Sequence, residues 1–164
     1  MKRAALLLLC VLCFFCSCGE EKISTRLMIE GVRENFSDFL GAVRIYYSDA
    51  EEGREGYIDE GLIIAMLGDG EVPVELQTVR EYAFLCSSQV SLGEVWAVEC
   101  RTYSGARDMY TLIQKRKKLL TAPDYENEKD VAAAEGTVLV RDGKRVFFAV
   151  NEKGAEIVGN STDG

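Results

Sequence analysis

The sequence predicts an α+β domain with a small, mostly antiparallel sheet of about four strands, a long helix packed on one face, and N-terminal helices. Three observations predict this class. Apolar residues recur at intervals of three and four in 29–43 and 106–120, the period of a helix buried on one side. Residues 79–88 and 94–101 are apolar and partly alternating, as strands are. Asp142-Gly143 stands between two further β-rich runs, which is typical of a hairpin.

The first nineteen residues have the organisation of an export signal. Lys2 and Arg3 precede an uninterrupted apolar run, 4–15, and small residues follow that run. The run is too short for a bilayer, which needs about 20 apolar residues. Gly19 and the charged residues after it prevent any extension. We therefore expect the protein to be exported.

The end of this signal resembles the bacterial lipobox, in which a small residue precedes a cysteine that receives a diacylglyceryl group. Cys18 follows the small Ser17, whereas Cys13 and Cys16 follow bulky residues, so Cys18 is the predicted lipidation site. Two acyl chains suffice for stable attachment. We expect an anchor on the outer face of the cytoplasmic membrane. The alternative is ordinary cleavage, which would release a secreted protein.

The length and charge of the part expected to be exported limit its domain count and its partners. Without residues 1–18 the chain is long enough for one domain. That part holds 17 Lys and Arg against 27 Asp and Glu, a net charge of −10. Nucleic acid is a poor partner for such a domain, because binding to it depends on positive side chains. Anionic membrane surfaces should also repel it, so the lipid would have to do the anchoring.

The first part of the exported chain is expected to hold a tether and a helix. Residues 19–24 are a short polar tether, and a helix capped by Thr25 is expected to run to about Leu40. Residues 43–47 continue that helix or form a short strand, and the pattern allows both. Residues 48–56 are charged and glycine-rich, which predicts a solvated loop.

The next elements are a short helix and two strands. Asp59 is the expected N-cap of a helix that ends at Leu67 before a glycine-rich break. Strands are expected over 79–88 and 94–101, joined by a hairpin loop with Gly93 at the position of positive φ.

The clearest helix is expected from a Ser104 cap to about Leu120. Four cations, 115–118, fall in its last turns, where positive charge suits a helix C-terminus. We interpret them as a solvated helix end rather than a polyanion site. Residues 121–135 are expected to be a long acidic connection.

The chain should close on a hairpin. Residues 137–141 and 144–150 flank Asp142-Gly143, a type I′ turn signal. Residues 153–164 are expected to be a polar C-terminal tail. One domain, 25–152, is predicted.

Cys86 and Cys100 are the cysteines that follow Cys18. In the expected hairpin they lie an even number of residues apart and share a face of the sheet, directly opposite or diagonal. An exported protein can form a disulfide between these two cysteines, and two buried free thiols are the alternative. A directly opposed pair would need roughly 5.5 Å between Cα atoms.

Catalytic motifs are not found in the sequence. There is no histidine, nucleophile elbow, P-loop, dinucleotide fingerprint or zinc spacing, and no cofactor is implied. One weak calcium candidate follows the spacing of an EF-hand loop, with lysine at the glycine position. Its residues are Asp124, Glu126, Glu128, Asp130 and Glu135.

The order of these features resembles a family of small bacterial envelope lipoproteins catalogued as domain of unknown function 4358. The shared features are the lipobox at Cys18, Tyr57-Ile58-Asp59, the strand 94–101, Lys115-Arg116 with Leu119, Tyr125 and the hairpin around Gly143. The chain departs from that pattern in its glycine-rich loop 48–56 and in Glu99-Cys100-Arg101. The resemblance implies an anchored extracytoplasmic domain and brings no catalytic residues to transfer.

The leading hypothesis from the sequence is a lipid-anchored, non-catalytic binding or interaction module of the bacterial cell envelope. Its partner would be an envelope protein or a ligand that the sequence does not name. The rival is an extracytoplasmic enzyme whose acidic residues act on a wall polymer or glycan. A structural envelope component is the third hypothesis. An enzyme should bring carboxylates together in a cleft, which separates the first two.

Overall fold

The computed structural model describes residues 23–40, 43–68, 70–87 and 92–162. The predicted α+β class is confirmed, with five strands in one antiparallel sheet. The strands are β1 (Val43–Tyr47), β2 (Val79–Ser87), β3 (Glu94–Cys100), β4 (Val138–Asp142) and β5 (Arg145–Val150). The helices are α2 (Thr25–Leu40), α3 (Glu60–Leu67), the 3-10 helix η1 (Val74–Thr78), α4 (Tyr103–Thr121), α5 (Glu128–Glu135) and α6 (Gly154–Thr162).

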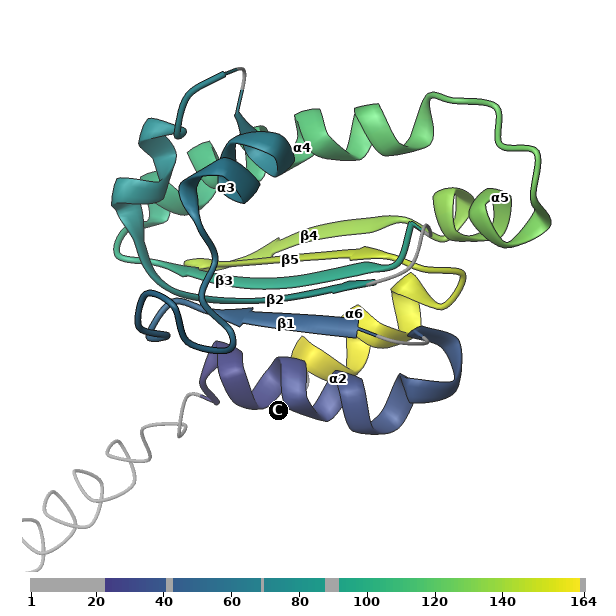
Figure 1. The fold of residues 1–164 in the computed structure, drawn as a ribbon, viewed down its shortest axis with the longest axis horizontal. Coiled ribbons are helices and arrows are strands. Elements are labelled where there is room, and N and C mark those ends of the chain that lie inside the picture. The colour runs from purple at the N-terminus through teal and green to yellow at the C-terminus, as the bar shows by residue number, and fades with distance from the viewer. Residues whose placement is uncertain (1–22, 41–42, 69, 88–91, 163–164) are drawn as a thin grey trace, which may run out of the picture.

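The sheet has the order β1-β2-β3-β5-β4, and helices cover both of its faces (Figure 1). Helices α3 and α4 lie on one face, and α2 and α6 lie on the other. The strands predicted over 79–88 and 94–101 are β2 and β3, which pair as the expected hairpin, and β5 pairs with β3 on the far side. The prediction of a positive φ at Gly93 was wrong, because the glycines with positive φ are Gly53, Gly56, Gly70 and Gly143 among the described residues. Residues 43–47, left open between helix and strand by the sequence, form the edge strand β1.

The core on the α4 face is built around aromatic side chains. Trp96 of β3 is buried between Phe84 of β2 and Phe148 of β5, with ring centroids 4.9 and 5.3 Å apart. The buried stripe of α4, which includes Met109 and Ile113, covers these rings. This packing agrees with the predicted helix across one face of the sheet.

The core on the α2 face is lined by smaller residues. Ala83, Ala97 and Ala149 contribute almost no bulk to this side of the sheet. Helix α2 packs here through Ile29 and Val32, two members of its predicted apolar face. The short alanine side chains let the helix lie close to the strands.

Helix starts were predicted with mixed success. Asp59 is the N-cap of α3, and its carboxylate accepts the Leu62 N–H at 2.8 Å. The prediction of Ser104 was wrong, because Thr102 is the N-cap of α4 and Ser104 lies inside the first turn. Similarly, the Ser24 hydroxyl, rather than Thr25, faces the first free N–H groups of α2.

Two segments expected to lack regular structure are helical. The acidic connection contains α5, whose N-cap Asn127 accepts the Asp130 N–H at 2.8 Å. The expected polar tail forms α6, which packs on the sheet through Ile157 and Val158. The apolar residues of α5 are one valine and three alanines, and those of α6 are an alanine, an isoleucine and a valine, so the sequence pattern was too weak to predict these helices.

The last hairpin is confirmed, although its turn lies one residue later than expected. Asp142 pairs with Arg145, which leaves Gly143 and Lys144 as the central residues. Only Gly143 has positive φ, at 56°, and glycine at the first central position is the pattern of a type II′ turn rather than type I′.

Candidate functional site

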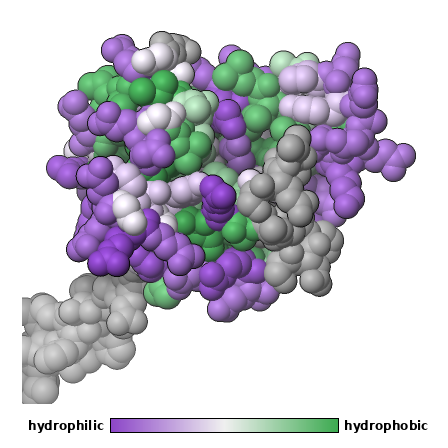
Figure 2. Space-filling view, in the orientation of Figure 1, coloured by the Kyte–Doolittle hydropathy of each residue, from purple (hydrophilic) through white to green (hydrophobic). Residues whose placement is uncertain are grey.

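A groove with three arginines lies between helix α2 and edge strand β1. Its volume is about 600 Å³, and its lining includes Arg26, Arg33, Arg44, Tyr46, Tyr47 and Glu55. We call it the arginine groove. Strand β1 lies toward the viewer in Figures 1 and 2, where hydrophobic surface meets strongly hydrophilic residues.

The local structure explains why these arginines converge. Arg26 and Arg33 are seven residues apart on α2, so two helical turns place them on one side of the helix. That side faces β1. Arg44 comes from β1 itself, where it is exposed and points to the opposite sheet face from its neighbour Ile45. The positive charges therefore approach the strand from both faces of the sheet.

Arg26 is held in place by its neighbours. Its guanidinium stacks over the Tyr47 ring, 3.7 Å from the centroid, and forms an ion pair with Asp49 at 2.5 Å. The Tyr47 hydroxyl donates a hydrogen bond to Glu30 at 3.3 Å. Burial raises the pKa of Tyr47, and the Glu30 carboxylate raises it further. Tyr47 therefore stays neutral and serves as a hydrogen-bond donor at physiological pH.

Arg33 and Arg44 differ from Arg26 in their pairing. Within the described residues, neither forms an ion pair with a carboxylate. Glu55 is the single carboxylate that lines the arginine groove. The groove thus offers two unpaired guanidinium groups, which can each form bidentate hydrogen bonds with a carboxylate or phosphate.

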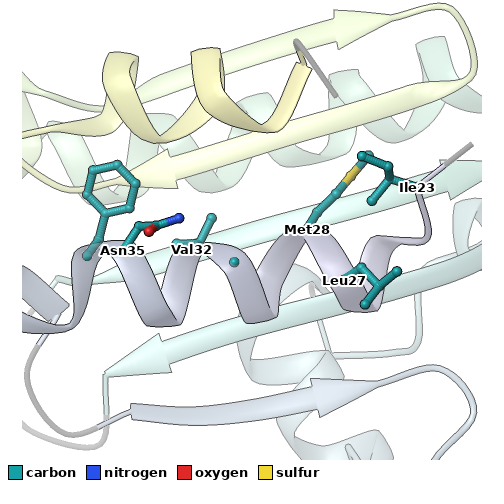
Figure 3. Close-up of a pocket in the computed structure, with 7 residues that line it drawn as sticks. Ile23, Leu27, Met28, Val32 and Asn35 are labelled. Atoms are coloured by element: carbon teal, nitrogen blue, oxygen red, sulfur yellow. The ribbon is translucent and has the colours of Figure 1, made fainter.

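A second, smaller groove runs along α2 on the side that faces α6 (Figure 3). Met28 and Val32 point from the helix toward α6, and Leu27 points away from it. The volume is about 140 Å³, and Asn35 supplies the polar side chain of an otherwise apolar lining. An apolar groove of this size has room for a few methylene groups and holds no chemistry for a reaction.

A buried polar cluster lies under α4, at the far side of the sheet. Arg116 forms an ion pair with Glu94 at 2.5 Å. Cys86 is directly opposite Glu94 on β2, and the indole N–H of Trp96 approaches its sulfur without a hydrogen bond of normal geometry. Burial raises the pKa of Cys86 to about 12, and the Glu94 carboxylate adds to this rise. A thiol with this pKa is a poor nucleophile at neutral pH.

A second buried carboxylate helps to fix the start of α2. Glu99 accepts hydrogen bonds from Arg145, and Arg145 also donates to the Ile23 carbonyl at 2.8 Å. The Thr25 N–H donates to Glu81 of β2 at 3.0 Å. Side chains from three strands therefore hold the point where the predicted tether joins the domain.

The predicted lipidation site, Cys18, lies outside the described residues. Of the two alternatives left open for Cys86 and Cys100, the structure has free thiols and no disulfide between them. They do share a sheet face, but Cys86 pairs with Glu94 and Cys100 pairs with Val79. Six residues of β3 separate the two positions, roughly 20 Å at 3.3 Å per residue, far beyond the reach of a disulfide.

The calcium candidate is also contradicted by the structure. Glu128, Asp130 and Glu135 lie in helix α5, which cannot wrap around an ion as a calcium loop does. Asp124 and Glu126 precede that helix and are exposed. Within the described residues, no group of three or more His, Cys, Asp or Glu side chains could hold a metal.

The cations at 115–118 differ from the expected solvated helix end. Arg116 is mostly buried by its pairing with Glu94, and the Lys117 ammonium donates to the Thr137 carbonyl at 3.0 Å. Lys115 and Lys118 are exposed, as expected. The arginine groove was missed because its three arginines are spread over 26–44 and form no run in the sequence.

Comparisons with known proteins give no relative for this fold or for either groove. No family model, curated protein or solved structure matches this chain. The resemblance to domain of unknown function 4358 stays a prediction carried by the residues quoted for it. None of the helices that the structure describes is both long and apolar enough to cross a membrane.

Proposed function

We propose that this protein is a non-catalytic binding module of the bacterial cell envelope. A lipid on Cys18 holds it at the outer face of the cytoplasmic membrane, and the arginine groove binds an anionic ligand. The observation that carries the proposal is the gathering of three arginines around one groove in a chain whose residues after Cys18 have a net charge of −10.

The charge balance makes this groove distinct from the rest of the surface. The domain as a whole has a net negative charge that disfavours anions, because acidic residues outnumber basic ones. Arg33 and Arg44 keep their charge available, since no described carboxylate pairs with them. A volume of about 600 Å³ is in the usual range for ligand sites, roughly 300 to 1,000 Å³.

The groove geometry favours binding over catalysis. An enzyme that cleaves a glycan with acidic residues needs two carboxyl groups on opposite sides of the scissile bond. Glu55 is the single carboxylate in the lining of the arginine groove, and the lining of the apolar groove along α2 contains no carboxylate. The rival hypothesis of an acid-dependent enzyme therefore lacks a site in either groove.

Charge reversal tests the groove. Calorimetry would measure binding of inorganic polyphosphate and of polyglutamate at low salt to the wild type and to an Arg33→Glu/Arg44→Glu variant. The matched control is Arg107→Glu/Lys115→Glu, which makes the same charge change on the exposed side of α4. We expect the groove variant to bind at least roughly tenfold more weakly and the control to bind almost normally. Equal losses in both variants would contradict a defined site.

The anchor has its own test. The intact mass of protein extracted from membranes should match a chain that begins at Cys18 and carries a diacylglyceryl group. Cys18→Ala should lack that mass. An unmodified wild-type protein in the culture medium would refute the anchor and leave a secreted binder.

A further inference from the structure

One side of strand β1 has backbone groups that no described strand covers. β1 is the first strand of the sheet, and its neighbour is β2. The Ser48 N–H donates to Tyr82 of β2, and hydrogen-bonded pairs alternate along an antiparallel ladder. The N–H and C=O groups of Val43, Ile45 and Tyr47 therefore point away from the sheet.

The loop after β1 covers one end of this edge. The outward N–H of Tyr47 donates to the Gly56 carbonyl at 2.9 Å, as a neighbouring strand would accept it. Gly56 has φ of 85°, a conformation that favours glycine, and it lies against the Tyr47 ring and the Ile45 carbonyl. The loop leaves the Ile45 N–H and the groups of Val43 facing the arginine groove.

The arginines are placed where the side chains of an added strand would project. Successive residues of a strand point to opposite faces of the sheet. Arg33 reaches the edge from α2 on one face, and Arg44 stands on the other. An extended segment that paired with β1 would point adjacent side chains to opposite faces of the sheet. Two adjacent carboxylates on that segment could therefore pair with Arg33 on one face and Arg44 on the other.

We propose that the arginine groove accepts an extended acidic segment of a partner protein, which adds to β1 as a sixth strand. Backbone hydrogen bonds to Ile45 and Val43 give the segment its register, and Arg33 and Arg44 select acidic side chains. The inference rests on the proposed function, because it names the class of ligand for the same groove.

Two other occupants would use the arginines differently. Lipid headgroups would pair with the guanidinium groups and leave the strand backbone solvated. A second copy of this chain would pair edge to edge, with both arginine sets facing each other and repelling. The outward backbone and the charge on both faces favour the acidic segment.

A labelled heptapeptide, Thr-Glu-Glu-Val-Glu-Glu-Thr, tests this inference on the full-length protein in non-ionic detergent. Fluorescence anisotropy would compare it with two N-methylated forms, one methylated at odd positions and one at even positions. Both forms keep every charge, but each blocks the N–H groups on one side of the peptide. We expect one form to bind roughly tenfold more weakly and the other to bind normally.

Amide hydrogen exchange locates the peptide. The Ile45 N–H should exchange more slowly in the complex, while the Arg44 N–H, which already faces β2, should not change. Arg33→Glu and Arg44→Glu should each weaken peptide binding, and Arg107→Glu should not.

The outcomes separate the two proposals. Equal binding of all three peptides, with no protection of Ile45, would refute strand addition and leave the anion groove intact. Failure of the peptide, polyglutamate and polyphosphate together would refute both. A wild-type dimer in which the Ile45 N–H is protected, and which the peptide does not dissociate, would assign the edge to a second copy and overturn the acidic segment. Binding to anionic vesicles that leaves exchange at the Ile45 N–H unchanged, together with no binding of the peptide, would overturn it in favour of lipid.

Discussion

Gly154→Ala should weaken the attachment of α6 to the sheet, because a methyl group has no room there. A Cβ at this position would lie less than 3.0 Å from the Gly136 carbonyl oxygen and 3.3 Å from the Ala149 carbonyl oxygen. Both obstacles are backbone atoms, so no side chain can rotate away. The first turn of α6 must move instead.

The size of the effect follows from what α6 buries. Ile157 is 0% exposed and Val158 is 5% exposed, and each fully buried side chain of this kind contributes about 1.5–3 kcal/mol. Complete loss of α6 packing would therefore cost at most about 3–6 kcal/mol. Local adjustment of an overpacked site typically costs about 1–3 kcal/mol. We expect a loss of about 2–4 kcal/mol in the free energy of unfolding.

Urea denaturation followed by circular dichroism would measure this change. The matched control is Gly159→Ala in the same helix, where an added Cβ meets nothing within 4 Å. Alanine in a helix interior should stabilise that variant by up to about 1 kcal/mol. If Gly154→Ala unfolds at the wild-type urea concentration, the close contact between α6 and the end of α5 is refuted.

Further predictions concern the Cys86 thiol, the N-cap of α3 and the ion pair of Glu94 with Arg116. At pH 8, Cys86 in the folded protein should react with iodoacetamide about a thousandfold more slowly than in urea. The reactive thiolate is scarcer in the folded protein, because burial raises the thiol pKa from 9.0 to about 12. Rapid labelling of the folded protein would contradict the burial of Cys86. The folded state holds this proton more tightly, so stability should fall as pH rises from 9 toward 12, and Cys86→Ala should fall less over that window in thermal melts. Asp59→Ala should lower the free energy of unfolding by about 1 kcal/mol through loss of the α3 cap, and an unchanged urea midpoint would contradict that role. Glu94→Met should cost about 3 kcal/mol by leaving Arg116 mostly buried without its partner, and Glu94→Met/Arg116→Met should recover most of it; equal losses in the single and double variants would show that the pair has no such role.

The sequence by itself determined the elements whose patterns are strong. The periodic apolar residues of α2 and α4 and the apolar runs of β2, β3 and β5 predicted these elements to within a few residues. Asp59 predicted the start of α3, and Asp142-Gly143 predicted the last hairpin. These signals are local, because each depends on side chains within one or two turns of the chain.

The tertiary structure alone decided which distant residues meet. The ladder register placed Cys86 opposite Glu94 rather than near Cys100, and no local signal specified that register. Helix α6 forms where its few apolar residues pack against Phe147 and Ala149 of β5, so tertiary packing rather than the sequence pattern specifies it. The arginine groove depends on α2 lying beside β1, since its charges are far apart in sequence and converge only through that packing.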